Sequence, residues 1–185
     1  MQKINHTTAS IQPVPVLPGK VLIFAVQTPK VVDRQVYFLF SIRQMEDILL
    51  GTSVTPVPFS QPYLKGIAQW QDNVVPVISL EECLGLESSN HRKDTQLIVV
   101  RVPAKDAGQH GYYRIMVEVV PPIRMLALPI DCGPVSDEWI RERHLVRGVY
   151  EWEDKFLVIA HMEKILHGAI DDNRENTTAS YQMRF

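Results

Sequence analysis

The side chains that could bind a metal ion or act as nucleophiles are scattered along this sequence. No two of the six histidines stand at the H-x-x-x-H spacing that turns two imidazoles toward one metal ion; they occupy positions 6, 91, 110, 144, 161 and 167. The two cysteines, Cys83 and Cys132, do not lie at ligand spacing from one another. His161 follows an apolar stretch, so we expect it to end a strand or cap a helix. We therefore predict no metal site.

The motifs of enzymes and cofactor-binding proteins are also missing. The sequence contains no G-x-S-x-G elbow, no Gly-Lys-Ser/Thr phosphate loop and no G-x-G-x-x-G fingerprint. Adjacent carboxylates point in different directions and do not form a shared acid–base site; the pairs are Glu46-Asp47, Glu81-Glu82 and Asp171-Asp172. Trp70 and Trp152 precede predicted turns, which favours cross-strand packing over a cofactor platform. We predict no catalytic residue and no cofactor, and expect that the protein is not an enzyme.

The composition is that of a folded domain and gives no indication of nucleic-acid binding or membrane insertion. Hydrophobic residues make up 45% and charged residues 22% of the 185 residues, enough to fill one core or that of two small lobes. The net charge of −2, without a long basic stretch, argues against nucleic acid as a partner. No apolar stretch approaches the roughly 20 residues that cross a bilayer. Because only two cysteines occur, we expect a cytoplasmic protein, with Cys83 as a small buried apolar side chain.

Short apolar runs separated by Gly, Pro, Asp and Asn predict an all-β sandwich or barrel. These runs cover residues 21–26, 35–42, 97–102, 112–120 and 123–128. The body of the protein is expected over residues 20–168. Residues 1–19 are rich in Pro and Thr, and residues 169–185 are polar, so we expect a flexible arm and a flexible tail.

An internal repeat at an offset of 82 residues is the strongest pattern in the sequence. Residues 63–84 align without gaps on residues 145–166, with five identical positions: Gly66/Gly148, Trp70/Trp152, Asp72/Asp154, Glu81/Glu163 and Leu84/Leu166. Each copy predicts a hairpin followed by a short helix. Two copies predict two similar lobes. Each lobe is too small to bury a core alone, so we expect the lobes to pack together.

The stretch over residues 37–84 resembles the first lobe of the CheW-like domain. The family's V-x-E-I element and its v-t-p-v-P, y-i-k-G and v-i-P-v-i segments have counterparts at residues 45–48, 54–58, 63–66 and 74–78. Residues 96–168 follow the family's second lobe in outline. The resemblance implies a mainly β fold of two pseudo-repeated five-stranded SH3-like barrels, packed across a hydrophobic seam, with short helices. The lobes are expected over roughly 35–90 and 91–168, with strands exchanged between them.

The resemblance also implies a non-catalytic adaptor that couples a chemoreceptor to a CheA-type histidine kinase in two-component signalling. CheW-like proteins bind the regulatory domain of the kinase and the cytoplasmic tip of the receptor. The positions that the family uses against these partners are occupied here by Met45, Asp47, Gly66, Gln69 and Gln71. Structural alternatives stand beside this interpretation: Met45 as core, Gly66 as a backbone requirement, and the glutamines as solvated side chains.

The sequence departs from the family at the partner-facing hairpin. The family's Asn-Leu-Arg-Gly turn is replaced by residues 69–72 (QWQD), and neutral Gln71 cannot reproduce the bidentate hydrogen bonds of the arginine. The glutamate of V-x-E-I is Asp47, and the segment 27–34 is longer than is usual. We therefore hypothesise a divergent adaptor of an alternative chemosensory system, such as one governing type IV pilus twitching or phototaxis. The alternative function is a small-molecule-binding sensory β-barrel, with a ligand cavity between the lobes.

Overall fold

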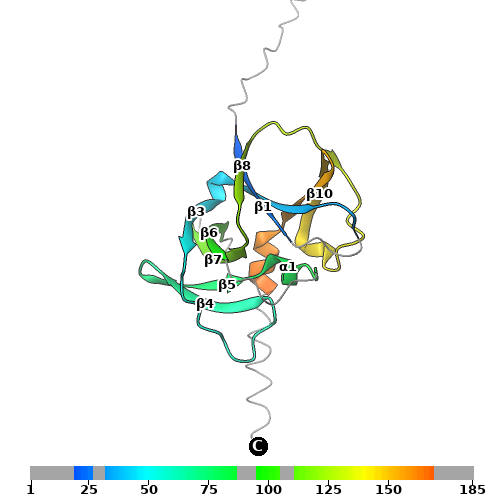
Figure 1. Ribbon diagram of the computed structural model, residues 1–185. Helices are drawn as coiled ribbons and strands as arrows, with labels where there is room; N and C mark the ends of the chain where they lie inside the picture. Colours follow the sequence, from blue (N-terminus) through cyan, green and yellow to red (C-terminus); the bar gives the residue numbers. More distant parts are fainter. Residues whose placement is uncertain (1–18, 27–31, 87–94, 105–110, 169–185) are drawn as a thin grey trace, which may run out of the picture.

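The computed structural model describes residues 19–26, 32–86, 95–104 and 111–168, and strands dominate these ranges (Figure 1). Every apolar run predicted to be a strand forms one, which confirms the mainly β prediction. Short helical elements connect them: η1 (Ile42–Gln44), α1 (Leu80–Cys83), η2 (Arg143–Leu145) and a helix over 162–168. The strands are β1 (Lys20–Ala25), β2 (Val36–Ser41), β3 (Met45–Leu50), β4 (Leu64–Trp70), β5 (Asn73–Ile78), β6 (Gln96–Pro103), β7 (Tyr112–Val119), β8 (Ile123–Ala127), β9 (Gly133–Pro134), β10 (Val146–Trp152) and β11 (Lys155–Ala160).

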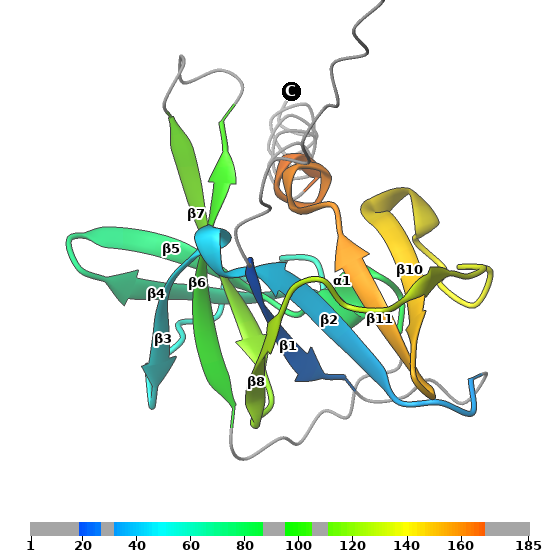
Figure 2. The ribbon, with the colours of Figure 1, turned by 90° about the horizontal axis from the view of Figure 1, so that it is seen from above.

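The strands form two sheets, which Figure 2 shows side by side. One is a five-stranded sheet in the order β3-β6-β7-β5-β4, and the other is a six-stranded sheet in the order β8-β1-β2-β11-β10-β9. In each sheet one parallel pair joins a central strand to a hairpin, β7 to β5 and β2 to β11, while the other pairs are antiparallel. The two sheets therefore share one plan, as the repeat predicts.

Each sheet takes strands from both halves of the sequence. The β1–β2 hairpin lies in the six-stranded sheet, and the chain then crosses to β3 in the five-stranded sheet. The β6–β7 hairpin lies in the five-stranded sheet, and the chain then crosses back to β8. The sheets thus divide differently from a cut near residue 90, because residues 36–41 belong with the C-terminal hairpin and residues 96–119 with the first hairpin. Strands that are apolar on both faces can complete either sheet, so their sequences do not reveal which one they join.

Three layers of buried side chains explain why the central strands are apolar on both faces. The layer between the sheets takes one face of each, including the fully buried Phe38 of β2, Val100 of β6 and Val117 of β7. The other face of each sheet covers its own smaller core. In the five-stranded sheet that core contains Ala68, Trp70, Val75, Val77, Leu97, Val99 and Met116; in the six-stranded sheet it contains Ile23, Tyr37 and Leu157. The hydrophobic seam expected between two lobes is therefore present.

The repeated segments adopt the same local structure. The β4–β5 hairpin leads into α1, and the β10–β11 hairpin leads into the helix over 162–168. The same backbone hydrogen bond closes each unit, from Ser79 N to Tyr63 O at 2.9 Å and from His161 N to Leu145 O at 2.7 Å. His161 thus stands between strand and helix, where the sequence predicted it.

Some predictions fall outside the described residues. These are the arm over 1–19, apart from Gly19, the tail over 169–185 and most of the segment 27–34. Within the ranges that the structure describes, no helix has both the length and the apolar character needed to cross a bilayer.

Candidate partner-binding surface

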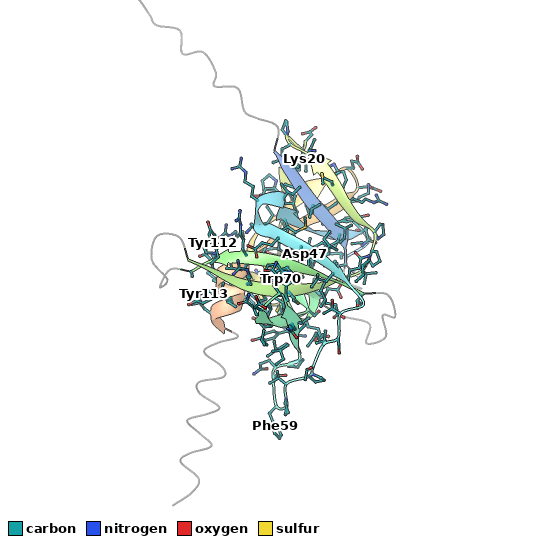
Figure 3. All side chains as sticks on the ribbon, turned by 90° about the vertical axis from the view of Figure 1, so that its left-hand side faces the viewer. Lys20, Asp47, Phe59, Trp70, Tyr112 and Tyr113 are labelled. Atoms are coloured by element: carbon teal, nitrogen blue, oxygen red, sulfur yellow. The ribbon has the colours of Figure 1, made fainter. Side chains whose placement is uncertain are left out.

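A tryptophan fastens the β4–β5 hairpin to the opposite edge of its sheet. Trp70, the last residue of β4, is 8% exposed and packs in the core of the five-stranded sheet. Its Nε1 donates a hydrogen bond of 3.0 Å to Oδ2 of Asp47 on β3 (Figure 3). Since β3 and β4 are the two edges of this sheet, the bond joins the edges to one another. The predicted packing role of Trp70 is confirmed.

Two carboxylates of β3 hold the Trp70 indole in place, Asp47 directly and Glu46 through Arg114. The second carboxylate oxygen of Asp47 accepts a hydrogen bond of 2.8 Å from Ile48 N, so both oxygens bond within the chain. On the face of the indole, the guanidinium of Arg114 lies 5.4 Å from the centre of the Trp70 ring. Arg114 Nε in turn donates to Oε2 of Glu46 at 2.7 Å. The carboxylates of β3 therefore orient the hairpin rather than form an acid–base pair.

Gly66 has a position that no other residue could take without displacing the backbone. Its φ of +148° lies in a region that L-residues rarely adopt. A Cβ built there would stand 2.2 Å from the carbonyl oxygen of Thr55, which pairs with Ile67 in an isolated β-bridge. Gly66 is buried, so it lets the loop before β4 approach the strand rather than face a partner.

The two glutamines of the hairpin lie on its exposed surface. Gln71 occupies the turn between β4 and β5 with a φ of 52°, and its counterpart in the repeat, Glu153, has a φ of 55°. Gln69 is exposed, and its Nε2 donates to the Gln71 carbonyl oxygen at 3.3 Å. The turn is therefore braced from within by the Gln69 side chain, next to position 71, where the family carries an arginine.

The five predicted site residues thus lie in three different places. Asp47, Gln69 and Gln71 lie together at the Trp70 end of the hairpin, and Gly66 lies further back along β4. Met45 is half-buried and packs against the layer between the sheets. Its side chain belongs with the seam and not with the exposed hairpin.

Exposed apolar side chains lie on the same hairpin as Gln69 and Gln71 and on β3. The sequence alone did not predict their exposure. On β3, Leu50 is 72% and Ile48 is 38% exposed; on the hairpin, Val74 is 69% and Ile67 is 36% exposed. Val74 lies directly opposite Gln69 in the β4–β5 register. Large apolar side chains of this exposure, on an edge strand and on a hairpin, are typical of protein contact surfaces. We call these four residues, with Gln69 and Gln71, the hairpin surface.

Two side chains with potential reactivity, Cys83 and His161, have pKa values shifted by their surroundings. Cys83 is 5% exposed, and burial, the largest influence, raises the pKa of its thiol to about 12. The prediction of an inert, buried thiol is therefore confirmed. Burial and the neighbouring Arg147 and Lys164 lower the pKa of His161. Among the residues that the structure describes, no group of three or more His, Cys, Asp or Glu side chains could hold a metal ion.

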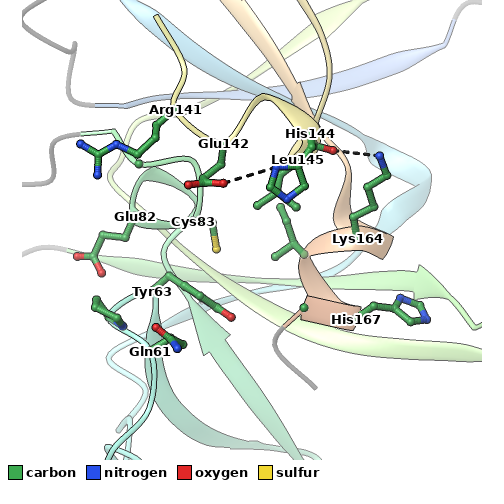
Figure 4. Close-up of a pocket in the computed structure, with 14 residues that line it drawn as sticks. Gln61, Tyr63, Glu82, Cys83, Arg141, Glu142, His144, Leu145, Lys164 and His167 are labelled. Carbon is green, nitrogen blue, oxygen red and sulfur yellow. Dashed lines mark hydrogen bonds and ion pairs between the residues drawn. The ribbon is translucent and has the colours of Figure 1, made fainter. Parts of the chain in front are cut away.

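A cavity of about 550 Å³ lies between the two repeat units (Figure 4). Tyr63 and Cys83 line it on one side, and Leu145 and Lys164 on the other. Several of its polar groups already have partners within the protein. Lys164 Nζ donates to the His144 carbonyl oxygen at 3.1 Å, and His144 Nδ1 lies 3.5 Å from Oε2 of Glu142.

Fold and surface together define a class: an all-β protein of two sheets with a duplicated hairpin-and-helix unit, whose exposed surface is suited to protein contacts. The family profile of the CheW-like domain matches residues 26–170, and the chain belongs to this family. It is 22% identical over 69% of its length to a chemotaxis protein CheW of Thermotoga maritima, covering 78% of that protein. It is 28% identical over 70% of its length to a CheW of Helicobacter pylori, covering 74% of it.

A solved structure shares the fold. The scaffolding protein TtCheW from Thermoanaerobacter tengcongensis superposes with a TM-score of 0.54 at 21% identity, over 78% of this chain and 89% of that one. At this level of identity the likeness concerns the fold alone. It agrees with the two-sheet architecture described above.

Proposed function

We propose that this chain is a non-catalytic adaptor that couples a chemoreceptor to a CheA-type histidine kinase in a bacterial chemosensory pathway. The hairpin surface carries the proposal: an exposed apolar and amide surface, held rigidly by Trp70, on the scaffold of the CheW-like domain. The names of its relatives, chemotaxis and scaffolding proteins, support the same assignment. The working unit is residues 20–168, and its partners place it in the cytoplasm.

The altered turn supports a divergent partner. A neutral Gln71 offers two amide donors and one carbonyl acceptor, whereas an arginine would offer a fixed positive charge. The surface recognised by this hairpin therefore needs no carboxylate opposite position 71. This favours an alternative chemosensory system, such as one that controls pilus motility, over standard receptor coupling.

The direct test is isothermal titration of the chain with the regulatory domain of the kinase and the cytoplasmic tip of the receptor from the same genome. Gln71→Glu introduces a charge at the proposed contact, so it should weaken one of these associations about tenfold while leaving the melting temperature unchanged. Glu153→Gln is the matched control, because it changes the equivalent turn of the other sheet, and it should bind normally. No binding of the wild-type chain to either partner would overturn the proposal.

The cavity between the repeat units is the one observation that favours the alternative, a small-molecule sensor. We rank it second because the Lys164 ammonium donates to a backbone carbonyl and the His144 ring lies 3.5 Å from the Glu142 carboxylate. A thermal shift produced by any member of a metabolite panel, and abolished by Leu145→Trp, would reverse this ranking.

A further inference from the structure

Phe59 is the most exposed large apolar side chain among the described residues, at 102% relative exposure. Figure 3 shows it at the far tip of the loop that precedes β4, away from the body of the molecule. Its φ of 60° belongs to the left-handed region, which a bulky side chain adopts only at a cost in free energy. Neither burial nor backbone preference accounts for a phenylalanine here.

The loop that carries Phe59 is held in place at several points. Ser60 Oγ donates to the Val57 carbonyl oxygen at 2.8 Å, directly beneath the tip. At the base of the loop, Thr55 and Ile67 exchange two backbone hydrogen bonds of 2.8 and 2.9 Å. Prolines at positions 56, 58 and 62 restrict the backbone further. A contact through Phe59 would therefore lose little conformational entropy on binding.

Phe59 and Gln71 lie beyond opposite ends of β4. The loop enters β4 at Leu64, and the turn that contains Gln71 follows Trp70. Seven strand residues at about 3.3 Å each separate the two ends by roughly 20 Å. A compact contact centred on Gln71 does not reach Phe59, so the loop forms a second and separate surface.

The composition of the loop restricts its partner. Residues 51–64 (GTSVTPVPFSQPYL) contain no charged side chain. Adhesion to an anionic membrane relies on Lys and Arg beside the inserted apolar groups, and this loop has none. An uncharged protrusion with one aromatic ring instead fits an uncharged apolar pocket on another protein, where aromatic anchors contribute much of the binding free energy.

We propose that Phe59 is an aromatic anchor that inserts into an apolar pocket of the regulatory domain of the kinase, while the hairpin surface binds the receptor tip. The assignment rests on the proposed adaptor function. The projecting ring is assigned to the kinase regulatory domain because a folded domain can offer a concave pocket. This leaves the hairpin surface to the receptor tip. The adaptor then holds its two partners through the tip of this loop and through the hairpin surface.

The test is titration of the full chain and two variants with each partner separately. Phe59→Asn removes the ring but suits a positive φ, so its melting temperature should equal or exceed that of the wild type. Its affinity for the kinase domain should fall about tenfold or more, with receptor binding unchanged. Phe59→Leu should retain part of the affinity, and Gln61→Ala, in the same loop, is the control that should bind as the wild type does.

Three other results contradict the anchor. Unchanged kinase binding by Phe59→Asn, with normal binding by the wild type, overturns the anchor and leaves the adaptor function standing. If Phe59→Asn lost receptor binding alone, the ring would contact the receptor tip, and the assignment to the kinase domain would be overturned. Failure of the wild-type chain to bind either partner removes the adaptor function and the anchor together.

Discussion

Asp47 and Trp70, 23 residues apart in the sequence, meet across the two edges of the five-stranded sheet through a hydrogen bond of 3.0 Å. Both residues stand where this sequence departs from its family, which has a glutamate and a leucine at these positions. The pair fixes the direction of the hairpin that we propose as a contact surface.

Removing the acceptor should destabilise the fold. Asp47→Ala leaves the buried indole N–H of Trp70 without its partner, at a cost of about 1–3 kcal/mol in the free energy of unfolding. Chemical denaturation followed by tryptophan fluorescence measures this cost. Trp70→Phe and the double variant complete a mutant cycle, which should give a coupling free energy of about 1 kcal/mol. Strictly additive effects would mean that the hydrogen bond contributes nothing.

Gly66→Ala should be among the most destabilising single substitutions in the chain. The added methyl group would meet the Thr55 carbonyl oxygen at 2.2 Å, at a φ that disfavours alanine, so we expect a loss of roughly 3 kcal/mol or more. Gly133→Ala is the matched control, since a Cβ there meets nothing within 4 Å and the residue lacks such a φ. Equal denaturation midpoints for the two variants would refute the close approach.

The buried thiol of Cys83 predicts a loss of stability at alkaline pH. Its pKa rises from 9.0 to about 12 on folding, so the unfolded chain releases this proton first. The contribution is complete below about pH 9 and declines as the pH rises toward 12, by at most about 1.4 kcal/mol per unit. Cys83→Ala should remove this slope, and Cys132→Ser, at an exposed thiol, should keep it. Equal slopes for the two variants would contradict the assignment.

Exposed apolar side chains of the hairpin surface should matter for association and little for folding. Leu50→Ser and Val74→Ser alter side chains that are 72% and 69% exposed, so their melting temperatures should stay close to that of the wild type. Binding to the receptor tip should weaken by about 1 kcal/mol or more in each variant. Met125→Ser is a control on the other sheet, at 52% exposure, and should bind normally. If Met125→Ser alone weakened binding, the receptor contact would lie on the six-stranded sheet instead.

The repeat was the part of the fold most accessible to sequence reasoning, because its turn and its glycine recur at a fixed offset. The exchange of strands was expected from the family resemblance alone, and no local pattern indicates it. A strand such as β6 is buried on both faces, so its sequence is compatible with either sheet. The three consecutive apolar residues at 48–50 likewise do not show which of them face outward until the register of β3 is known.

The candidate site was predictable where a residue is exposed in a turn and less so where its partners are distant. Gln71 lies on the surface, as its place in a turn suggests, and Gln69 beside it is exposed on β4. The bond of Asp47 depends on contact between two sheet edges, which no local pattern encodes. The exposure of Phe59 was not predictable, because its flanking prolines predict a loop but not the direction of a side chain.

A three-component assembly shows whether this chain joins two polypeptides without chemistry of its own. The wild-type chain, the kinase regulatory domain and the receptor tip should elute together at the mass of a ternary complex in size-exclusion chromatography with light scattering. The kinase domain and the receptor tip should associate far more weakly when the chain is omitted. Elution of the chain as a free species beside both partners would contradict the account.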